Sequence, residues 1–174
     1  MDAEHLSEAA TADGADLSAA LWREREALEL LLYKLEMQQL LLTAGRTEWL
    51  NVATRELETT VELLRTAGVD RAIAAQERAD AWGFDPAASL REIVAAAPDP
   101  LWQELLGEHL AAMSQLGDRI VRTRDANLSL LRTAERAAVQ ALEAISFADE
   151  PGLYGSDGRA EGAATTARLV DRDL

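Results

Sequence analysis

The chain has 174 residues, a formal net charge of −14 at pH 7 and no cysteine. No concentrated basic face is present, which argues against nucleic-acid binding, and without cysteine neither disulfides nor thiol chemistry is available. The uninterrupted apolar runs are far shorter than the roughly 20 residues that span a bilayer, and the N-terminus lacks the basic and apolar blocks of a signal peptide. We therefore expect a soluble, cytoplasmic protein without membrane insertion.

The first helix is predicted after a polar N-terminal segment. Residues 1–15 mix acidic and small residues without an apolar period, which indicates an acidic, disordered tail. A helix then extends to about residue 44, with Asp16 or Ser18 as its expected cap. Its seam positions recur at alternating spacings of four and three, which is a heptad pattern that needs a partner helix; they are Leu21, Arg25, Leu28, Leu32, Leu35, Gln39 and Leu42.

A tight turn at Gly45 separates this helix from a second one, predicted over residues 48–82. Glycine adopts the left-handed conformation that ends a helix, and Thr47 can cap the next one. Because the loop is short, the two helices are expected to form an antiparallel hairpin. Gly68 lies inside the second helix, where it indicates either tolerated drift, close packing or a hinge.

Two further capping signals follow the glycine-proline break after the second helix. Ser89 and Glu92 fit a capping box that begins a short helix. Asp99 can cap a third helix that has Pro100 at its first position and continues to about residue 148. Residues 149–174 are rich in glycine, alanine and charge, and we expect them to form a flexible tail.

These elements predict an all-α fold: an antiparallel helical hairpin plus a long third helix, in a coiled-coil-like three-helix bundle with flexible tails. The helical domain is expected over residues 16–148, between tails at 1–15 and 149–174. The seam of the third helix is drawn through Leu106, Leu110, Met113, Gly117, Ile120, Arg124, Asn127, Leu131, Ala134, Ala138, Leu142 and Ile145.

The third helix is predicted to be longer than its neighbours. At about 1.5 Å per residue its last dozen residues, about 136–148, would extend past the hairpin loop unless a kink or a longer connection removes the excess. An apolar stripe without a partner in its own chain predicts a partner-binding surface. Its residues are Val139, Leu142, Ile145 and Phe147.

The sequence contains no constellation that predicts an enzyme, a cofactor site or a metal site. Neither His5 nor His109 belongs to a Glu-x-x-His pair, and His109 is interpreted as a histidine on the surface or boundary of a helix. Arg124 and Asn127 occupy seam positions, where they either fix the register of a core or lie at the edge of a slightly rotated seam. The four tryptophans lie near predicted helix ends, where they would close the bundle. Tyr154 follows a lone leucine in the polar tail and is either a short docking motif or without function.

The stretch EREALELLLYKLEMQQLLLTAGRTEWLNVATREL resembles the FlgN family of flagellar export chaperones. The later pieces agree in order: a Gly-Phe loop, SLREIVAAAP, the segment RDANLSLL in the long helix and a Tyr-Gly tail. The likeness covers about residues 17–155.

The resemblance implies an all-helical cytosolic chaperone that binds hook–filament junction subunits before their secretion. In that family the partner is the helical C-terminal end of the subunit, bound by the C-terminal helix of the chaperone. Carried over to this chain, the partner-binding positions are Leu128, Leu131, Val139, Leu142 and Ile145, beside Phe147 from the length argument. Tyr154 would contact the export machinery. The alternative is a coiled-coil structural adaptor that self-associates as a homodimer.

Overall fold

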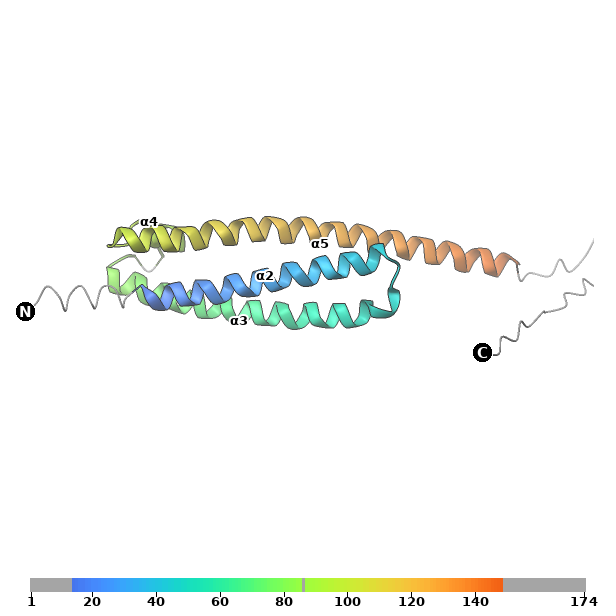
Figure 1. Ribbon diagram of the computed structural model, residues 1–174, viewed down its shortest axis with the longest axis horizontal. Coiled ribbons are helices and arrows are strands. Elements are labelled where there is room, and N and C mark those ends of the chain that lie inside the picture. Colours follow the sequence, from blue (N-terminus) through green and yellow to red (C-terminus); the bar gives the residue numbers. More distant parts are fainter. Residues whose placement is uncertain (1–13, 86, 149–174) are drawn as a thin grey trace, which may run out of the picture. The chain divides into compact units, whose positions relative to one another are not determined.

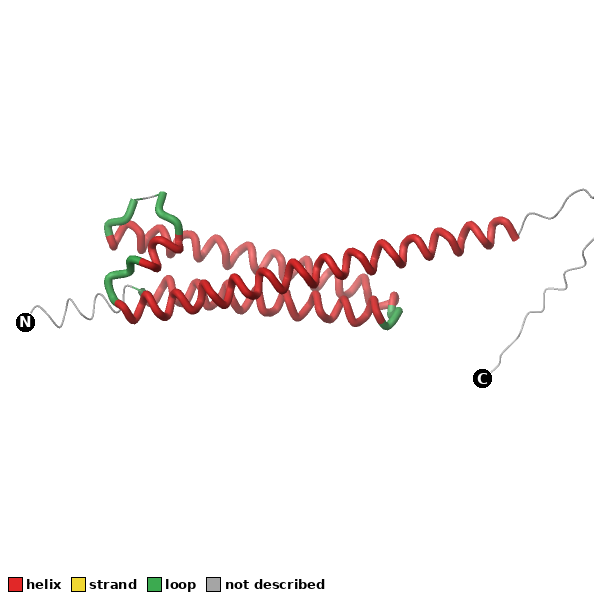
Figure 2. Tube along the Cα trace, turned by 90° about the horizontal axis from the view of Figure 1, so that it is seen from above, coloured by secondary structure: helices red, strands yellow, loops and turns green. Residues whose placement is uncertain are grey.

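The computed structural model describes residues 14–85 and 87–148, and every regular element in these ranges is helical (Figures 1 and 2). The elements are α2 (Ala15–Thr43), the 3₁₀ helix η1 (Thr47–Trp49), α3 (Leu50–Trp82), α4 (Leu90–Ala95) and α5 (Pro100–Ala148). The predicted all-α fold is confirmed. Apart from Gly14 and Ala15, the predicted tails lie outside the described residues.

The chain divides into two compact units, Met1–Leu131 and Arg132–Leu174. The first unit holds α2, η1, α3, α4 and the part of α5 up to Leu131. The described part of the second unit is the remainder of α5, which is assigned as one helix of 49 residues. Each unit is described by itself below.

The turn between α2 and α3 is held by backbone hydrogen bonds. Gly45 has a φ of 67°, and the N–H of Arg46 donates to the carbonyl oxygen of Leu41 at 2.9 Å. This is the Schellman arrangement that ends a helix at a left-handed residue, as predicted. The predicted side-chain cap is wrong, because Thr47 is the first residue of η1 and makes no capping hydrogen bond.

The expected cap of α2 is also wrong. The helix begins at Ala15, after Gly14, and no side chain of the described residues caps it. Asp16 and Ser18 therefore lie inside the first turn. The acidic Asp16 near the N-terminus is still favourable for the helix dipole.

The capping signals on either side of α4 are confirmed. Ser89 Oγ accepts from the Glu92 N–H at 3.3 Å, and the Glu92 carboxylate accepts from the Ser89 N–H at 2.7 Å. Asp99 accepts from the Leu101 N–H at 2.9 Å, with Pro100 as the first residue of α5. These residues satisfy backbone N–H groups in the first turns of α4 and α5.

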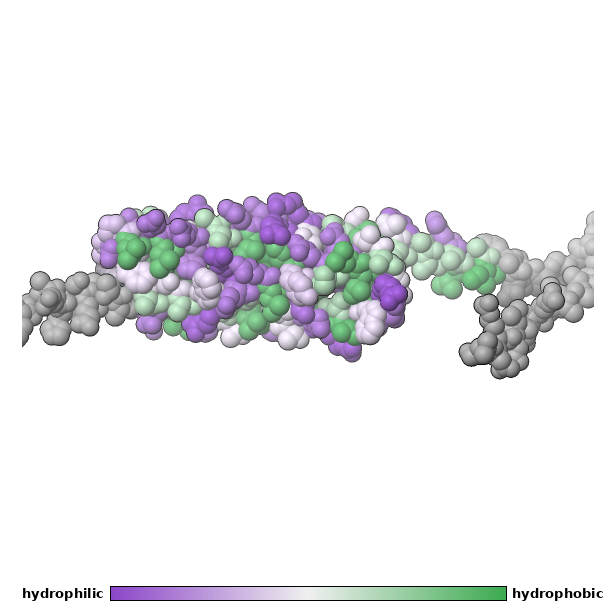
Figure 3. Space-filling view, in the orientation of Figure 1, coloured by the Kyte–Doolittle hydropathy of each residue, from purple (hydrophilic) through white to green (hydrophobic). Residues whose placement is uncertain are grey.

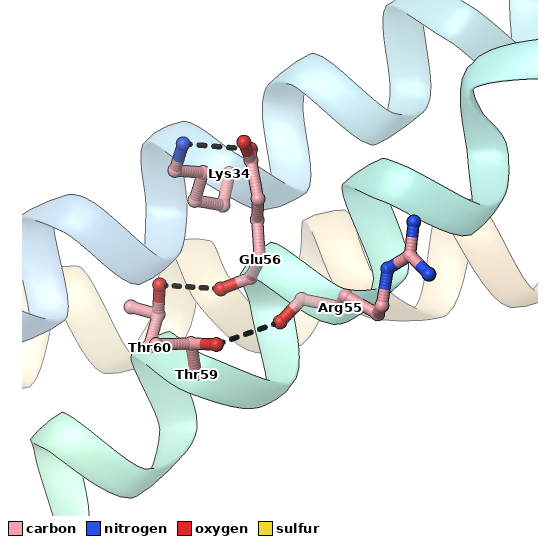
Figure 4. A network of polar contacts seen from close by, with 5 residues as sticks. All are labelled: Lys34, Arg55, Glu56, Thr59 and Thr60. Carbon is pink, nitrogen blue, oxygen red and sulfur yellow. Dashed lines mark hydrogen bonds and ion pairs between the residues drawn. The ribbon is translucent and has the colours of Figure 1, made fainter.

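Helices α2 and α3 form the predicted antiparallel hairpin. Glu24 pairs with Arg71, whereas Lys34, further along α2, pairs with Glu56 at 2.8 Å. Around the second pair, Thr60 Oγ1 donates to the Glu56 carbonyl oxygen at 2.8 Å (Figure 4). The side chains that α3 buries are small and are mostly seven residues apart, so the two backbones can approach closely; they are Ala53, Thr60, Ala67, Ala74, Ala75 and Ala79.

Gly68 lies within this close contact. A Cβ placed on Gly68 would be 3.4 Å from a carboxylate oxygen of Glu24. This distance is an ordinary van der Waals contact with the end of a flexible side chain, so packing at this position does not require a glycine. Helix α3 continues through Gly68 without an interruption that would indicate a hinge.

Helix α5 runs parallel to α2 within the first unit. The ring of Trp22 contacts His109, and Glu36 pairs with Arg119 at 3.1 Å. Contacts further along α2 therefore meet residues further along α5. The main apolar core lies at the end of the hairpin opposite the Gly45 turn and consists of Leu17, Ala20, Leu21, Ala74, Ala75, Val94 and Leu106.

Candidate partner-binding surface

The seam of α5 in the first unit is rotated relative to the predicted one. Its buried residues are Leu106, His109, Leu116 and Asn127, whereas Arg124 is exposed. Of the two predicted alternatives, a place in the seam or a place at its edge, each therefore holds for one of the two polar residues. Arg124 lies at the edge and binds Asp125, and Asn127 lies in the seam.

Asn127 is only 2% exposed and holds α5 against α2 through its amide. Its Nδ2 donates to the Leu35 carbonyl oxygen at 2.9 Å and to Gln38 Oε1 at 3.1 Å. Its own Oδ1 is buried without a hydrogen-bond partner. A polar pair in a coiled-coil seam fixes register at some cost in stability.

Leu128 and Leu131 follow Asn127 in the first unit. Their side chains are 40% and 38% exposed, so neither belongs to the buried seam. The sequence pattern predicted Leu131 in the buried seam, and this prediction is wrong. Both leucines are available at the surface of the unit, three residues apart on one side of the helix.

In the second unit, every side chain from residue 132 to residue 146 is exposed. Val139, Leu142 and Ile145 are 48%, 65% and 62% exposed. Their spacing of three places them on one face of the helix. Figure 3 shows apolar surface on this last described part of α5.

The composition of residues 132–146 widens this apolar face. Alanines recur at spacings of three and four beside the three large side chains; they are Ala134, Ala137, Ala141 and Ala144. Two arginines and two glutamates make the segment formally neutral in a chain of charge −14. Glu135, Arg136 and Glu143 lie three or four residues from Val139, so Val139 stands at the edge of the apolar face, beside these charges. An amphipathic helix of this kind can approach a second helix closely and without charge repulsion.

Two of the predicted binding residues cannot be placed. Phe147 belongs to α5, but its side chain lies outside the described residues. Tyr154 lies outside them altogether. Their roles stay predictions.

The interpretation of His109 as a surface or boundary histidine is wrong. It is 5% exposed and packs edge-on against Trp22, with 5.9 Å between the ring centroids. Burial lowers the pKa of the imidazole, the positive charge of Arg25 lowers it further, and Glu108 opposes them. The spacing of Trp102, Leu106 and His109 along α5 is the signal that could have placed this histidine in the seam.

The tryptophans are divided between the core and the surface. Trp82 and Trp102 pack against the apolar core, whereas Trp22 and Trp49 are about half exposed. Trp22 belongs to an open groove between α2 and α5 that no motif in the sequence indicated.

Within residues 14–85 and 87–148, no group of three or more metal-ligating side chains occurs. No helix in these ranges is long and apolar enough to cross a membrane. The fold defines an all-α helical-bundle protein that offers apolar helix surface.

A family model described as FlgN protein matches residues 14–162, which is most of the chain. The chain therefore belongs to the FlgN family. This is a family of flagellar export chaperones, and its members bind flagellar proteins. The partner of this protein is therefore a flagellar protein. No match was found among curated proteins or among solved structures.

Proposed function

We propose that this protein is a cytoplasmic export chaperone for hook–filament junction subunits, and that it binds their helical C-terminal segment along the apolar side chains of α5. The observation that carries the proposal is the exposure of Val139, Leu142 and Ile145 on one face of a helix. Leu128 and Leu131 extend the set in the first unit.

The energetics favour a helical partner. Burial of one Val, Leu or Ile side chain contributes about 1.5–3 kcal/mol, and only the surplus over the cost of association appears as affinity. Three such side chains on one face are therefore enough for a specific contact only if the partner covers all of them. An amphipathic helix with its own apolar stripe does so.

The experiment is a calorimetric titration of the full chain with a peptide from the C-terminal end of a junction subunit. Leu142→Asp should weaken binding at least about 30-fold, since it removes about 2 kcal/mol of burial and places a charge in the contact. Leu63→Asp is the matched control, because Leu63 is an exposed leucine of α3. Binding by Leu142→Asp that equals the binding by Leu63→Asp would contradict the assigned surface.

The alternative is a structural adaptor in which a second copy of the chain covers the same apolar face. Sedimentation of the full chain over a range of concentrations separates the two functions. A chaperone that self-associates should dissociate when the client peptide is added, whereas a dimer that persists in the presence of the peptide supports the adaptor.

Contact of Tyr154 with the export machinery is a separate part of the proposal. Cells with a Tyr154→Ala variant should export less client, although the variant still binds the peptide.

A further inference from the structure

A groove of about 670 Å³ lies between the first turns of α2 and α5, within the first unit. Ala15, Ser18 and Trp22 line it from α2, and Trp102, Leu105 and His109 line it from α5. Trp22 is 51% exposed although its ring contacts His109. The groove is therefore an apolar surface, separate from the client surface proposed above.

Trp102 and His109, which line the groove, each have a buried nitrogen atom without a hydrogen-bond partner. Trp102 Nε1 and His109 Nδ1 are both buried, and neither makes a hydrogen bond. An indole N–H can only donate, so Trp102 needs an oxygen acceptor. Leaving such a group unsatisfied costs about 1–3 kcal/mol, which an occupant with carbonyl or carboxylate oxygens would recover.

Two arginines and one glutamate line the groove, so its lining has a formal charge of +1 in a chain of net charge −14. Arg23 and Arg25 line the groove, and of these Arg25 binds Glu29 at 2.9 Å. Glu108 is the acidic residue on the α5 side. An occupant with carboxylates beside an apolar anchor would suit Arg23 and the indole walls together.

The chain itself has a segment of this composition attached at the groove. Gly14 lies so close to Trp102 that a Cβ would collide with the indole ring, and Ala15 is part of the lining. Residues 1–13, which lie outside the described residues, have four acidic side chains and neither lysine nor arginine. Seven residues separate Leu6 from Gly14. At about 3.3 Å per residue, an extended chain of this length lets Leu6 reach the groove from Gly14.

We infer that residues 1–13 dock into this groove, with Leu6 against Trp22 and Leu105 and with an oxygen of the segment accepting from Trp102 Nε1. The attachment at Gly14 gives the segment a high effective concentration at the groove, so weak contacts suffice. The contact covers an apolar surface of the chaperone and is independent of client binding along α5.

The test uses the full chain labelled with 5-fluorotryptophan, which gives one fluorine NMR signal for each of the four tryptophans. Leu6→Ser should shift the signals of Trp22 and Trp102 and make them more accessible to acrylamide. Trp49, in η1 at the hairpin turn, should not change. Ser7→Ala is the matched control in the same segment and should leave all four signals in place.

Raising the salt concentration should move the Trp22 and Trp102 signals in the same direction as Leu6→Ser, because screening weakens the contact of the acidic segment with Arg23. Signals of Trp22 and Trp102 that are identical in the natural chain and in Leu6→Ser would overturn the inference. Signals that change with protein concentration would also overturn it, since they would show that a second copy occupies the groove.

Discussion

Replacing Asn127 with alanine should lower the free energy of unfolding by about 3 kcal/mol. The substitution removes the hydrogen bonds to the Leu35 carbonyl oxygen and to Gln38 Oε1, at 2.9 and 3.1 Å, in a side chain that is 2% exposed. Each such bond contributes about 1 kcal/mol, and the cavity left in the seam adds about 1 kcal/mol more.

Asn127→Leu should behave differently, because it fills the seam. It also removes the buried Oδ1 that lacks a partner in the natural chain. These gains offset the lost hydrogen bonds, so this variant should lie within about 1 kcal/mol of the natural chain. The amide of Gln38, which is also buried, then loses a partner, and Gln38→Leu combined with Asn127→Leu should be more stable than Asn127→Leu alone.

The assay is urea denaturation followed by circular dichroism, with Gln115→Ala as a control at an exposed position of α5. The control should change the free energy of unfolding by less than about 0.5 kcal/mol. A double-mutant cycle of Asn127→Ala and Gln38→Ala should give a coupling of about 1 kcal/mol. If Asn127→Ala cost no more than Gln115→Ala, the buried amides would not hold the parallel seam and the reasoning would be refuted.

Four further substitutions test other parts of the fold by the same denaturation assay. Ser89→Ala removes half of the capping box of α4 and should cost about 1 kcal/mol; an unchanged midpoint would show that α4 does not depend on its cap. Gly83→Ala should cost about 1–2 kcal/mol because φ is 75° there, whereas Gly107→Ala, inside α5 with open space around it, should stabilise by about 0.5–1 kcal/mol. For His109 the pKa is lowered in the folded state, so the unfolded chain binds the proton more readily and the free energy of unfolding should fall as the pH drops below about 6.5. His109→Gln should remove that part of the pH dependence, and an unaltered pH profile would contradict the burial of this histidine.

The elements of the fold could be predicted where their signals are local. Gly45, the Ser89–Glu92 pair and Pro100 act through the backbone of their own turns, so the sequence alone indicates the hairpin, the short helix and the start of α5. The predicted caps Asp16, Ser18 and Thr47 failed for a related reason. Several polar residues near a helix start can serve as caps, and the sequence does not show which backbone N–H groups remain free.

The rotation of the seam could not be predicted, because it depends on where the neighbouring helix lies. Arg124 and Asn127 are three residues apart on α5, and a small rotation decides which of them is buried. The same rotation buries His109 and exposes Leu131. The groove at Trp22 depends on the distance between two helices that are far apart in the sequence, and heptad spacing does not report that distance.

The exposed side chains of α5 agree with the pattern from which the binding surface was predicted, but exposure by itself does not identify a partner. Leu63 of α3 and Leu40 of α2 are also exposed. What distinguishes residues 132–146 is that every side chain there is exposed and that Leu142, Ile145 and the alanines share a helix face, with Val139 at its edge, in a segment without net charge.

Hydrogen exchange of the full chain, free and in complex with a junction subunit, tests the client surface most directly. In the free chain all side chains of residues 132–146 are exposed, and this helical segment should exchange faster than the part of α5 around Asn127. The complex should slow exchange in residues 132–146 more than anywhere in α3. Unchanged exchange in this segment, with new protection confined to α2 or α3, would contradict the account.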